Sequence, residues 1–273
     1  MRDEVIEKNV RDALLEDIGS GDLTAALIPD EIVNAHVIAR EPAIICGRHW
    51  FNETFLQVDP SVTVAWLVED GDRIEADTMV CRLHGPARAL LTAERTALNF
   101  LQTLSGTATQ AHRYADAVAH TKTRVLDTRK TIPGLRDAQK YAVKCGGGTN
   151  HRMGLYDAYL IKENHIAACG SITGAVNKAR SLRPDLTVEV EVETIAQLRE
   201  TIACKADIAL LDNFSLEQVA SAVAIAKGVI QLEVSGVVTL DNIIDYANLG
   251  IDYISVGALT KHIRAIDYSM LFE

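Results

Sequence analysis

Hydrophobic and polar positions follow two different rhythms along this chain, and the change falls near residue 106. In the first part the pattern predicts an acidic amphipathic helix at the N-terminus, then short strands and a second helix, which together make a small α+β module. In the rest, short apolar runs alternate with amphipathic stretches, as in parallel strands joined by crossover helices. We predict domains at residues 1–105 and 106–259, and a C-terminal segment, 260–273, that returns to the N-terminal domain. The other elements predicted in the first domain are strands at 35–39, 62–68 and 79–83 and a helix at 87–104.

Six apolar runs of the second domain are predicted strands, and nearly every one ends in a polar or glycine-containing group. Because the carboxyl ends of the strands of an α/β barrel face one mouth, these groups predict a single active site. Six strand-helix units are fewer than a complete barrel has, so either the barrel is short or two units are hidden in the pattern. The runs are 124–127, 158–161, 187–192, 208–211, 230–234 and 253–256.

Charge is distributed unevenly. The chain has 273 residues, a hydrophobic content of 48% and a formal net charge of -10, so it can bury a large core. Between Lys122 and Lys162 nine Lys or Arg residues face three Asp residues, a local balance of +6, which leaves -16 on the remainder. Such a remainder repels nucleic acids and membrane surfaces, which excludes both as expected partners. A small polyanion suits the basic segment better.

Other bulk features indicate a cytoplasmic protein. No apolar run approaches the roughly 20 residues of a membrane span, and the acidic N-terminal helix does not have the pattern of a signal peptide. The five cysteines are odd in number, lie far apart and form no C-x-x-C pair. We therefore expect neither a disulfide framework nor a zinc knuckle.

The densest candidate chemistry lies in residues 145–153. Gly146–Gly148 is a triple glycine. Three glycines in a row carry an entropic cost on folding, which would be explained if the backbone approached a ligand closely here. It leads into His151 and Arg152, which bring two anion donors to the same place. Asp127–Thr131 and Lys162–His165 add cations at the ends of two predicted strands. Together these segments predict a site for a small anionic ligand.

These motifs, in this order, resemble those of the quinolinate phosphoribosyltransferase family, also called nicotinate-nucleotide pyrophosphorylases (carboxylating). The resemblance implies an α/β fold, with an N-terminal α/β sandwich domain and an open six-stranded α/β barrel-like domain, in agreement with the six predicted strands. It also implies homodimers or higher homo-oligomers in which the N-terminal domain of one subunit covers the barrel mouth of the next. The motifs span nearly the whole chain: Glu16–Thr24, Glu94–Asn99, Asp127–Thr131, Gly147–Arg152, Lys162–His165, Glu189–Glu193 and Ser255–Thr260.

The reaction that the resemblance implies joins quinolinate to phosphoribosyl pyrophosphate and requires Mg²⁺. It releases pyrophosphate and carbon dioxide and leaves nicotinate mononucleotide, a step of de novo NAD biosynthesis. Both substrates are densely anionic, which suits the basic segment. The resemblance implies that Mg²⁺ binds mainly through the pyrophosphate, with Glu191 and Asp212 nearby; magnesium prefers oxygen ligands.

The resemblance also assigns residues to the two quinolinate carboxylates. Arg129 and Arg152, with Arg95 from the neighbouring subunit, are expected to clamp them, because a guanidinium can donate two parallel hydrogen bonds and keeps its charge. His151 is expected to donate to the same carboxylate or to a phosphate, and Thr128 to contact substrate. The alternatives are surface arginines in ion pairs and a structural histidine.

The remaining assignments concern the phosphoribosyl group. Lys130 and Lys162 are expected to act as catalytic cations, and Glu191 and Asp212 as catalytic acids near the ribose. Backbone N–H groups after two strands are expected to cradle the 5-phosphate. This sequence departs from the commonest family pattern at Val237 and Val238 and again at Lys261 and His262, which leaves the phosphate geometry and the role of His262 open. The cradle residues are Ser235, Gly236, Val237, Gly257, Ala258 and Leu259.

Three alternatives stay open. A barrel aldolase would use Lys162 as a Schiff-base amine, although an anion-rich site keeps a lysine protonated. A related pyrophosphorylase-like protein associated with molybdenum transport would share many motifs and act on another acceptor. A non-catalytic barrel would bind phosphorylated metabolites without turnover.

Overall fold

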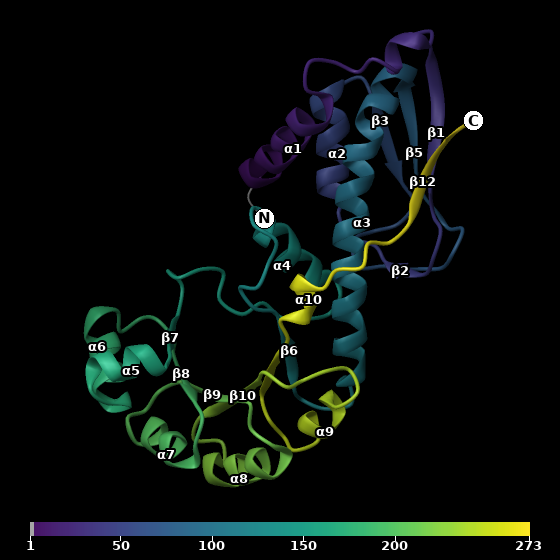
Figure 1. Ribbon diagram of the computed structural model, residues 1–273. Coiled ribbons are helices and arrows are strands. Elements are labelled where there is room, and N and C mark those ends of the chain that lie inside the picture. The colour runs from purple at the N-terminus through teal and green to yellow at the C-terminus, as the bar shows by residue number, and fades with distance from the viewer. Residues whose placement is uncertain (1–2) are drawn as a thin grey trace. The chain divides into compact units, whose positions relative to one another are not determined.

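The computed structural model describes residues 3–273, which divide into two compact units (Figure 1). The first unit holds the residues up to His112 together with Thr131–Gly147 and Leu259–Glu273. The second holds Arg113–Lys130 and Gly148–Ala258. No helix formed by residues 3–273 combines the length and the apolar character that a membrane crossing needs.

An antiparallel sheet with strand order β12-β1-β5-β3 forms one layer of the first unit. Buried and less buried positions alternate along β1, so that Ala35, Val37 and Ala39 enter the core, as a strand with one buried face requires. β1 pairs with β5 and, at the other side, with the C-terminal strand β12. The strands are β1 (Ile32–Ala39), β3 (Thr63–Trp66), β5 (Met79–Pro86) and β12 (Tyr268–Phe272), with a separate pair, β2 (Ala43–Ile44) and β4 (Arg73–Ile74).

Helices complete the first unit. Val10 and Leu14 of the predicted N-terminal helix are buried together with Trp50 and Leu104 in a second core cluster. Phe51 and Phe55 pack against the sheet in the first cluster. The elements are α1 (Asp3–Ile18), η1 (Ala25–Leu27), α2 (Arg48–Val58), α3 (Ala87–Ala117), α4 (Arg136–Cys145) and α10 (Ala258–Lys261), the last of which begins at the end of the second unit.

The helix predicted at 87–104 is longer than its sequence suggests, because α3 continues to Ala117. Gly106 and the Ser/Thr-rich residues around it resemble a helix end, since glycine is a poor helix former. The structure gives Gly106 a packing role instead. A Cβ at this position would lie 2.2 Å from the carbonyl oxygen of Arg264. Only glycine lets the C-terminal segment pass this closely over the helix.

We therefore expect Gly106→Ala to destabilise the protein, although alanine is the better helix former by about 1 kcal/mol. The clash with the Arg264 carbonyl is a backbone contact, which no side-chain rotation relieves, and overpacking of this kind costs about 1–3 kcal/mol. Thermal and denaturant unfolding measure the change. Asn99→Ala, at an exposed position of the same helix, is the matched control and should be unchanged or slightly more stable, since alanine is the better helix former there too. A Gly106→Ala protein as stable as the control would contradict this packing account.

The second unit contains the predicted six-stranded parallel sheet, with strand order β6-β11-β10-β9-β8-β7. All six predicted strands are present, within one or two residues at each end. β6 and β7 are the edges, so the sheet is an open, barrel-like structure. Figure 1 shows helices α5 to α9 along the outside of its curve. The strands are β6 (Arg124–Leu126), β7 (Tyr159–Ile161), β8 (Val188–Val192), β9 (Ile208–Asp212), β10 (Gln231–Ser235) and β11 (Tyr253–Ser255).

N-cap residues mark the start of three helices of the second unit. Thr194 and Ser215 are N-cap residues whose side chains accept the backbone N–H three residues on, and Gln197 and Gln218 complete capping boxes. Ser171 caps α6 in the same way, without the reciprocal bond. These caps fix where α6, α7 and α8 begin. The helices are α5 (Glu163–Cys169), α6 (Ile172–Leu182), α7 (Ile195–Ala203), α8 (Leu216–Ala226) and α9 (Ile243–Ala247).

Candidate active site

A cavity of about 240 Å³ lies in the second unit, lined by residues from the ends of its parallel strands and the loops that follow them. Eight of the predicted site residues line it: Thr128, Arg129, Lys130, His151, Arg152, Lys162, Glu191 and Ser235. The same wall includes Leu160, Leu210, Glu233 and Ser255. A second cavity, of about 550 Å³, shares Arg129, Arg152, Leu160 and Lys162 with the first and continues toward α5 and α6.

The loop that carries His151 and Arg152 is tied to β6 by Asp127. The Asp127 side chain is fully buried and accepts hydrogen bonds from the Asn150 side-chain nitrogen at 2.5 Å and from the His151 backbone N–H at 2.9 Å. Thr149 forms a parallel bridge with Leu126 in the same place. The motif residues 127 and 150–151 therefore act on each other, and Asp127 has a positioning function that the sequence did not reveal.

Two arginines lie close enough to affect each other electrostatically. Burial is the main cause that lowers the pKa of Arg152, and the positive charge of Arg129 lowers it further. Arg152 also donates from Nη1 to the Ala158 carbonyl oxygen at 3.3 Å, which orients its side chain. Asp157 accepts the N–H groups of Met153 and Gly154 at 2.6 and 3.1 Å and shapes the turn that follows. A pair of adjacent guanidinium groups favours the binding of an anion.

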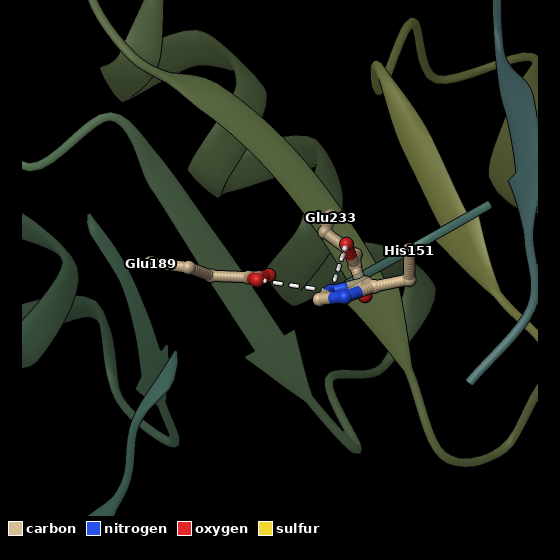
Figure 2. Close-up of side chains that lie close together, drawn as sticks. All are labelled: His151, Glu189 and Glu233. Atoms are coloured by element: carbon tan, nitrogen blue, oxygen red, sulfur yellow. Dashed lines mark ion pairs between the residues drawn. The ribbon is translucent and has the colours of Figure 1, made fainter. Parts of the chain in front are cut away.

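His151 lies between two buried carboxylates, as Figure 2 shows. Its Nε2 is 2.9 Å from Glu189 Oε2 and 3.5 Å from Glu233 Oε2. Its Nδ1 accepts the Arg152 backbone N–H at 2.7 Å. Glu233 was not predicted from sequence, and Glu189 was recognised only as one of several motif glutamates. The pattern that both share is a glutamate between two apolar residues of a predicted strand, at Val188–Val190 and Leu232–Val234.

The charges of these three side chains are coupled. Burial lowers the pKa of His151, but Glu189 and Glu233 outweigh it and raise the value to about 10. Protonation of Nδ1 would, however, set two N–H groups against each other at the Arg152 contact, so in this conformation the single ring proton lies on Nε2, facing Glu189. Burial raises the pKa of Glu189 to about 7, Glu233 acts in the same direction, and the contact with His151 opposes them.

Lys162, Glu191 and Asp212 form a second charged group. Lys162 Nζ makes an ion pair with Glu191 Oε2. Asp212 does not line the cavity but ends the neighbouring strand β9, where burial and the Glu191 charge raise its pKa while Lys162 and Lys130 lower it. The side-chain nitrogen of Asn213 donates to Asp212 Oδ2 at 2.9 Å. The predicted cations and acids are therefore within electrostatic reach of one another.

The remaining predicted residues lie outside the cavity wall. Gly236 has a φ of 103°, and a Cβ there would lie 2.1 Å from Asn213 Oδ1, so only glycine fits after β10. Gly257 passes close to Lys130, whose Cδ would be 3.0 Å from an added Cβ. Val237 is exposed, Ala258 begins α10 and Leu259 is fully buried. Arg95 is an exposed residue of α3 in the first unit.

Comparisons with protein families cover most of the chain. The family model for the quinolinate phosphoribosyl transferase C-terminal domain matches residues 107–271. The model for the N-terminal domain of the same family matches residues 22–105. Together the two models account for almost all of the sequence.

Individual relatives agree. The chain is 41% identical over 267 residues to a probable nicotinate-nucleotide pyrophosphorylase [carboxylating] of Bacillus subtilis, covering 97% of this chain and 92% of that protein. It is 42% identical over 272 residues to a nicotinate-nucleotide pyrophosphorylase [carboxylating] of Mycobacterium leprae, covering 96% and 95%. A solved nicotinate-nucleotide pyrophosphorylase from Francisella tularensis superposes with a TM-score of 0.98 at 49% identity, over 100% of this chain and 98% of that one.

Proposed function

The chain belongs to the quinolinate phosphoribosyltransferase family, and we propose that it is a nicotinate-nucleotide pyrophosphorylase (carboxylating) of NAD biosynthesis. As such it transfers the phosphoribosyl group of phosphoribosyl pyrophosphate to quinolinate, with loss of carbon dioxide. The observation that carries the proposal is one cavity at the strand ends that gathers four cations, Arg129, Lys130, Arg152 and Lys162. Two anionic substrates require such a concentration of positive charge.

Quinolinate is proposed to bind in the part of the cavity lined by Arg129, Arg152 and His151. In this proposal the two guanidinium groups bind its carboxylates by paired hydrogen bonds and hold the pyridine ring in one orientation. The ring nitrogen then attacks the anomeric carbon of the ribose. The new C–N bond forms as the bond between that carbon and the pyrophosphate oxygen breaks, and the electron pair leaves with pyrophosphate.

Lys130, Lys162, Glu191 and Asp212 are proposed to act on the phosphoribosyl part. The two lysines stabilise the charge that develops on the leaving pyrophosphate, and the acids orient the ribose hydroxyls and offset the positive charge of the oxocarbenium-like transition state. Thr128, Ser235 and the backbone from Gly236 to Val237 and from Gly257 to Leu259 are proposed to contact the substrate phosphate and ribose.

The residues near Asp212 fit a magnesium ion. Glu191 lies near the end of β8 and Asp212 ends the adjacent strand β9. Burial is the main cause that raises the pKa of Asp212, and the charge of Glu191 raises it further. A divalent cation would relieve this repulsion, and two carboxylates with substrate phosphate oxygens are ligands that Mg²⁺ commonly has. When bound, Mg²⁺ would neutralise the departing pyrophosphate.

Loss of carbon dioxide follows from the chemistry of the bound intermediate. Once the ring nitrogen carries the ribose, its positive charge stabilises the carbanion that remains when the adjacent carboxylate leaves as carbon dioxide. A proton then completes the mononucleotide. The chain's own part is to hold the ring in place while the carboxylate departs.

A turnover assay tests the function and its metal together. Purified protein with quinolinate, phosphoribosyl pyrophosphate and Mg²⁺ is expected to release carbon dioxide and to form nicotinate mononucleotide. Excess chelator should reduce the rate to background, because the charge of the departing pyrophosphate is no longer neutralised. Added Mg²⁺ should restore the rate. Full activity in excess chelator would contradict the magnesium proposal.

The same assay separates the alternatives. A protein with another acceptor would release pyrophosphate only with that acceptor, and a non-catalytic barrel would bind substrate without product. The ion pair of Lys162 with Glu191 disfavours a Schiff-base mechanism, since a nucleophilic amine must be neutral. Borohydride that traps substrate on Lys162 would support the aldolase alternative.

We also propose that the active form is a homodimer or a higher homo-oligomer. Arg95 is exposed on α3, so its side chain is not enclosed by the core of its own subunit. We propose that it extends into the cavity of a neighbouring subunit. In that arrangement each active site contains residues from two chains.

A further inference from the structure

Two glutamates inside the parallel sheet have no part in the proposed chemistry. Glu189 of β8 is 2% exposed and Glu233 of β10 is 0% exposed. Among the described residues, Glu189 Oε1 and both carboxylate oxygens of Glu233 have no hydrogen-bond partner. Buried carboxylates with so few partners destabilise a folded protein, so a purely structural role does not account for them.

Both glutamates face the same imidazole. Figure 2 shows the two side chains converging on His151 from different strands, with its Nε2 at 2.9 Å from Glu189 and 3.5 Å from Glu233. The opposite ring nitrogen accepts the N–H of Arg152 at 2.7 Å, and the His151 backbone donates to Asp127 at 2.9 Å. The ring is therefore fixed at both nitrogens, and its position is linked to the backbone of Arg152.

We propose that Glu189 and Glu233 are positioning residues for the pyridine dicarboxylate, and that they act through His151 and the attached backbone of Arg152. In this proposal the two glutamates fix the orientation of the His151 ring. The fixed ring holds the backbone of Arg152, so that the Arg152 guanidinium points to the part of the cavity where the quinolinate carboxylates bind. This inference rests on the proposed function, since it assumes that quinolinate occupies this end of the cavity. Neither glutamate is proposed to contact a reacting atom.

A cation bound by the same three side chains is the competing explanation, because their ligand atoms lie within 4.8 Å of one another. The distance of 2.9 Å between Nε2 and Glu189 favours a hydrogen bond, with the ring proton on Nε2. A protonated nitrogen has no lone pair for a metal. The geometry therefore favours positioning over coordination.

The test uses two isosteric variants, Glu233→Gln and Glu189→Gln, which remove one charge each and keep an acceptor. The KM for quinolinate at saturating phosphoribosyl pyrophosphate is expected to rise about 10-fold, because each variant replaces a charged partner of the His151 ring by a neutral one and holds the ring less firmly. The KM for phosphoribosyl pyrophosphate should change by less than about twofold, because His151 and Arg152 are proposed to bind quinolinate and not phosphoribosyl pyrophosphate. Unfolding temperatures should stay unchanged or rise, since a poorly paired buried charge is removed.

Two controls make the result specific. Glu217→Gln removes an exposed carboxylate from α8 and should leave both KM values unchanged. In a His151→Ala background, Glu233→Gln should add no further change, because the glutamate acts through the missing ring. Glu189→Leu, which lacks an acceptor, should be more impaired than Glu189→Gln. If one variant does not fold, the variant on the other strand tests the same prediction.

Three results would overturn the inference. The first is an unchanged quinolinate KM in a folded variant. The second is a parallel rise of both KM values with a loss of stability, which indicates a structural role. The third is a stoichiometric metal ion, found by elemental analysis of the wild-type protein and lost in Glu233→Gln. A wild-type protein without quinolinate turnover would refute the proposed function itself, whereas an active wild type with normal variants refutes only this inference.

Discussion

Replacing Arg152 with alanine is expected to raise the KM for quinolinate at least about 30-fold, or to abolish turnover, because a charge-assisted pair in a partly desolvated site is worth about 2–5 kcal/mol. Arg152 lines both cavities of the second unit and lies next to Arg129, so its loss removes half of the guanidinium pair. Steady-state kinetics with each substrate varied in turn measures the effect.

The design distinguishes charge from shape. Arg152→Lys keeps a positive charge but cannot form two parallel hydrogen bonds, so its KM should lie between those of the wild type and Arg152→Ala. Arg183→Ala removes an exposed arginine of the same unit that is paired with Asp185, and should leave the kinetics unchanged. Circular dichroism and unfolding curves show whether each variant is folded. A folded Arg152→Ala protein with normal kinetics would remove this residue from the site.

The strands of the second unit could be predicted because each is a short apolar run that ends in a polar group. In a parallel sheet the carboxyl ends come together, which predicts that Thr128–Lys130, Lys162 and Glu191 meet. His151 and Arg152 lie in a loop that follows no strand of this sheet, and their place at the site was predicted from the glycine-rich segment before them and from the family resemblance.

Other features depend on contacts that the sequence does not show. The glycine inside α3 is explained by the approach of Arg264 to Gly106, two residues far apart in the chain. Glu233 lies between Leu232 and Val234, and in isolation this alternation is equally typical of a strand with one face in solvent. Its burial against His151 is visible only in three dimensions. The role of Asp127 in holding the His151 loop was hidden for the same reason.

The proposed role of Arg95 in the cavity of a neighbouring subunit leads to the second prediction with a large effect. If Arg95 acts in the cavity of a neighbouring subunit, Arg95→Ala and Arg152→Ala should each be inactive alone and should complement each other when mixed. In a hybrid dimer the Arg95→Ala chain keeps an intact second unit and receives Arg95 from its partner, so one of the two sites is complete. Random association of equal amounts then gives about a quarter of the wild-type activity, because half of the dimers are hybrids.

The matched control mixes Arg129→Ala with Arg152→Ala. Both residues line the same cavity, so each site of a hybrid still lacks one of them and activity should not return. Differently tagged chains, co-expressed and purified through both tags, show that hybrids have formed and enrich them to about half of the wild-type activity. If Arg95 instead served the cavity of its own chain, both sites of an Arg95→Ala and Arg152→Ala hybrid would be defective. Hybrids isolated without any recovery of activity would therefore place Arg95 in its own subunit's site, and would remove the main reason to expect that catalysis requires two chains. An Arg95→Ala protein that is fully active by itself would place Arg95 outside the site.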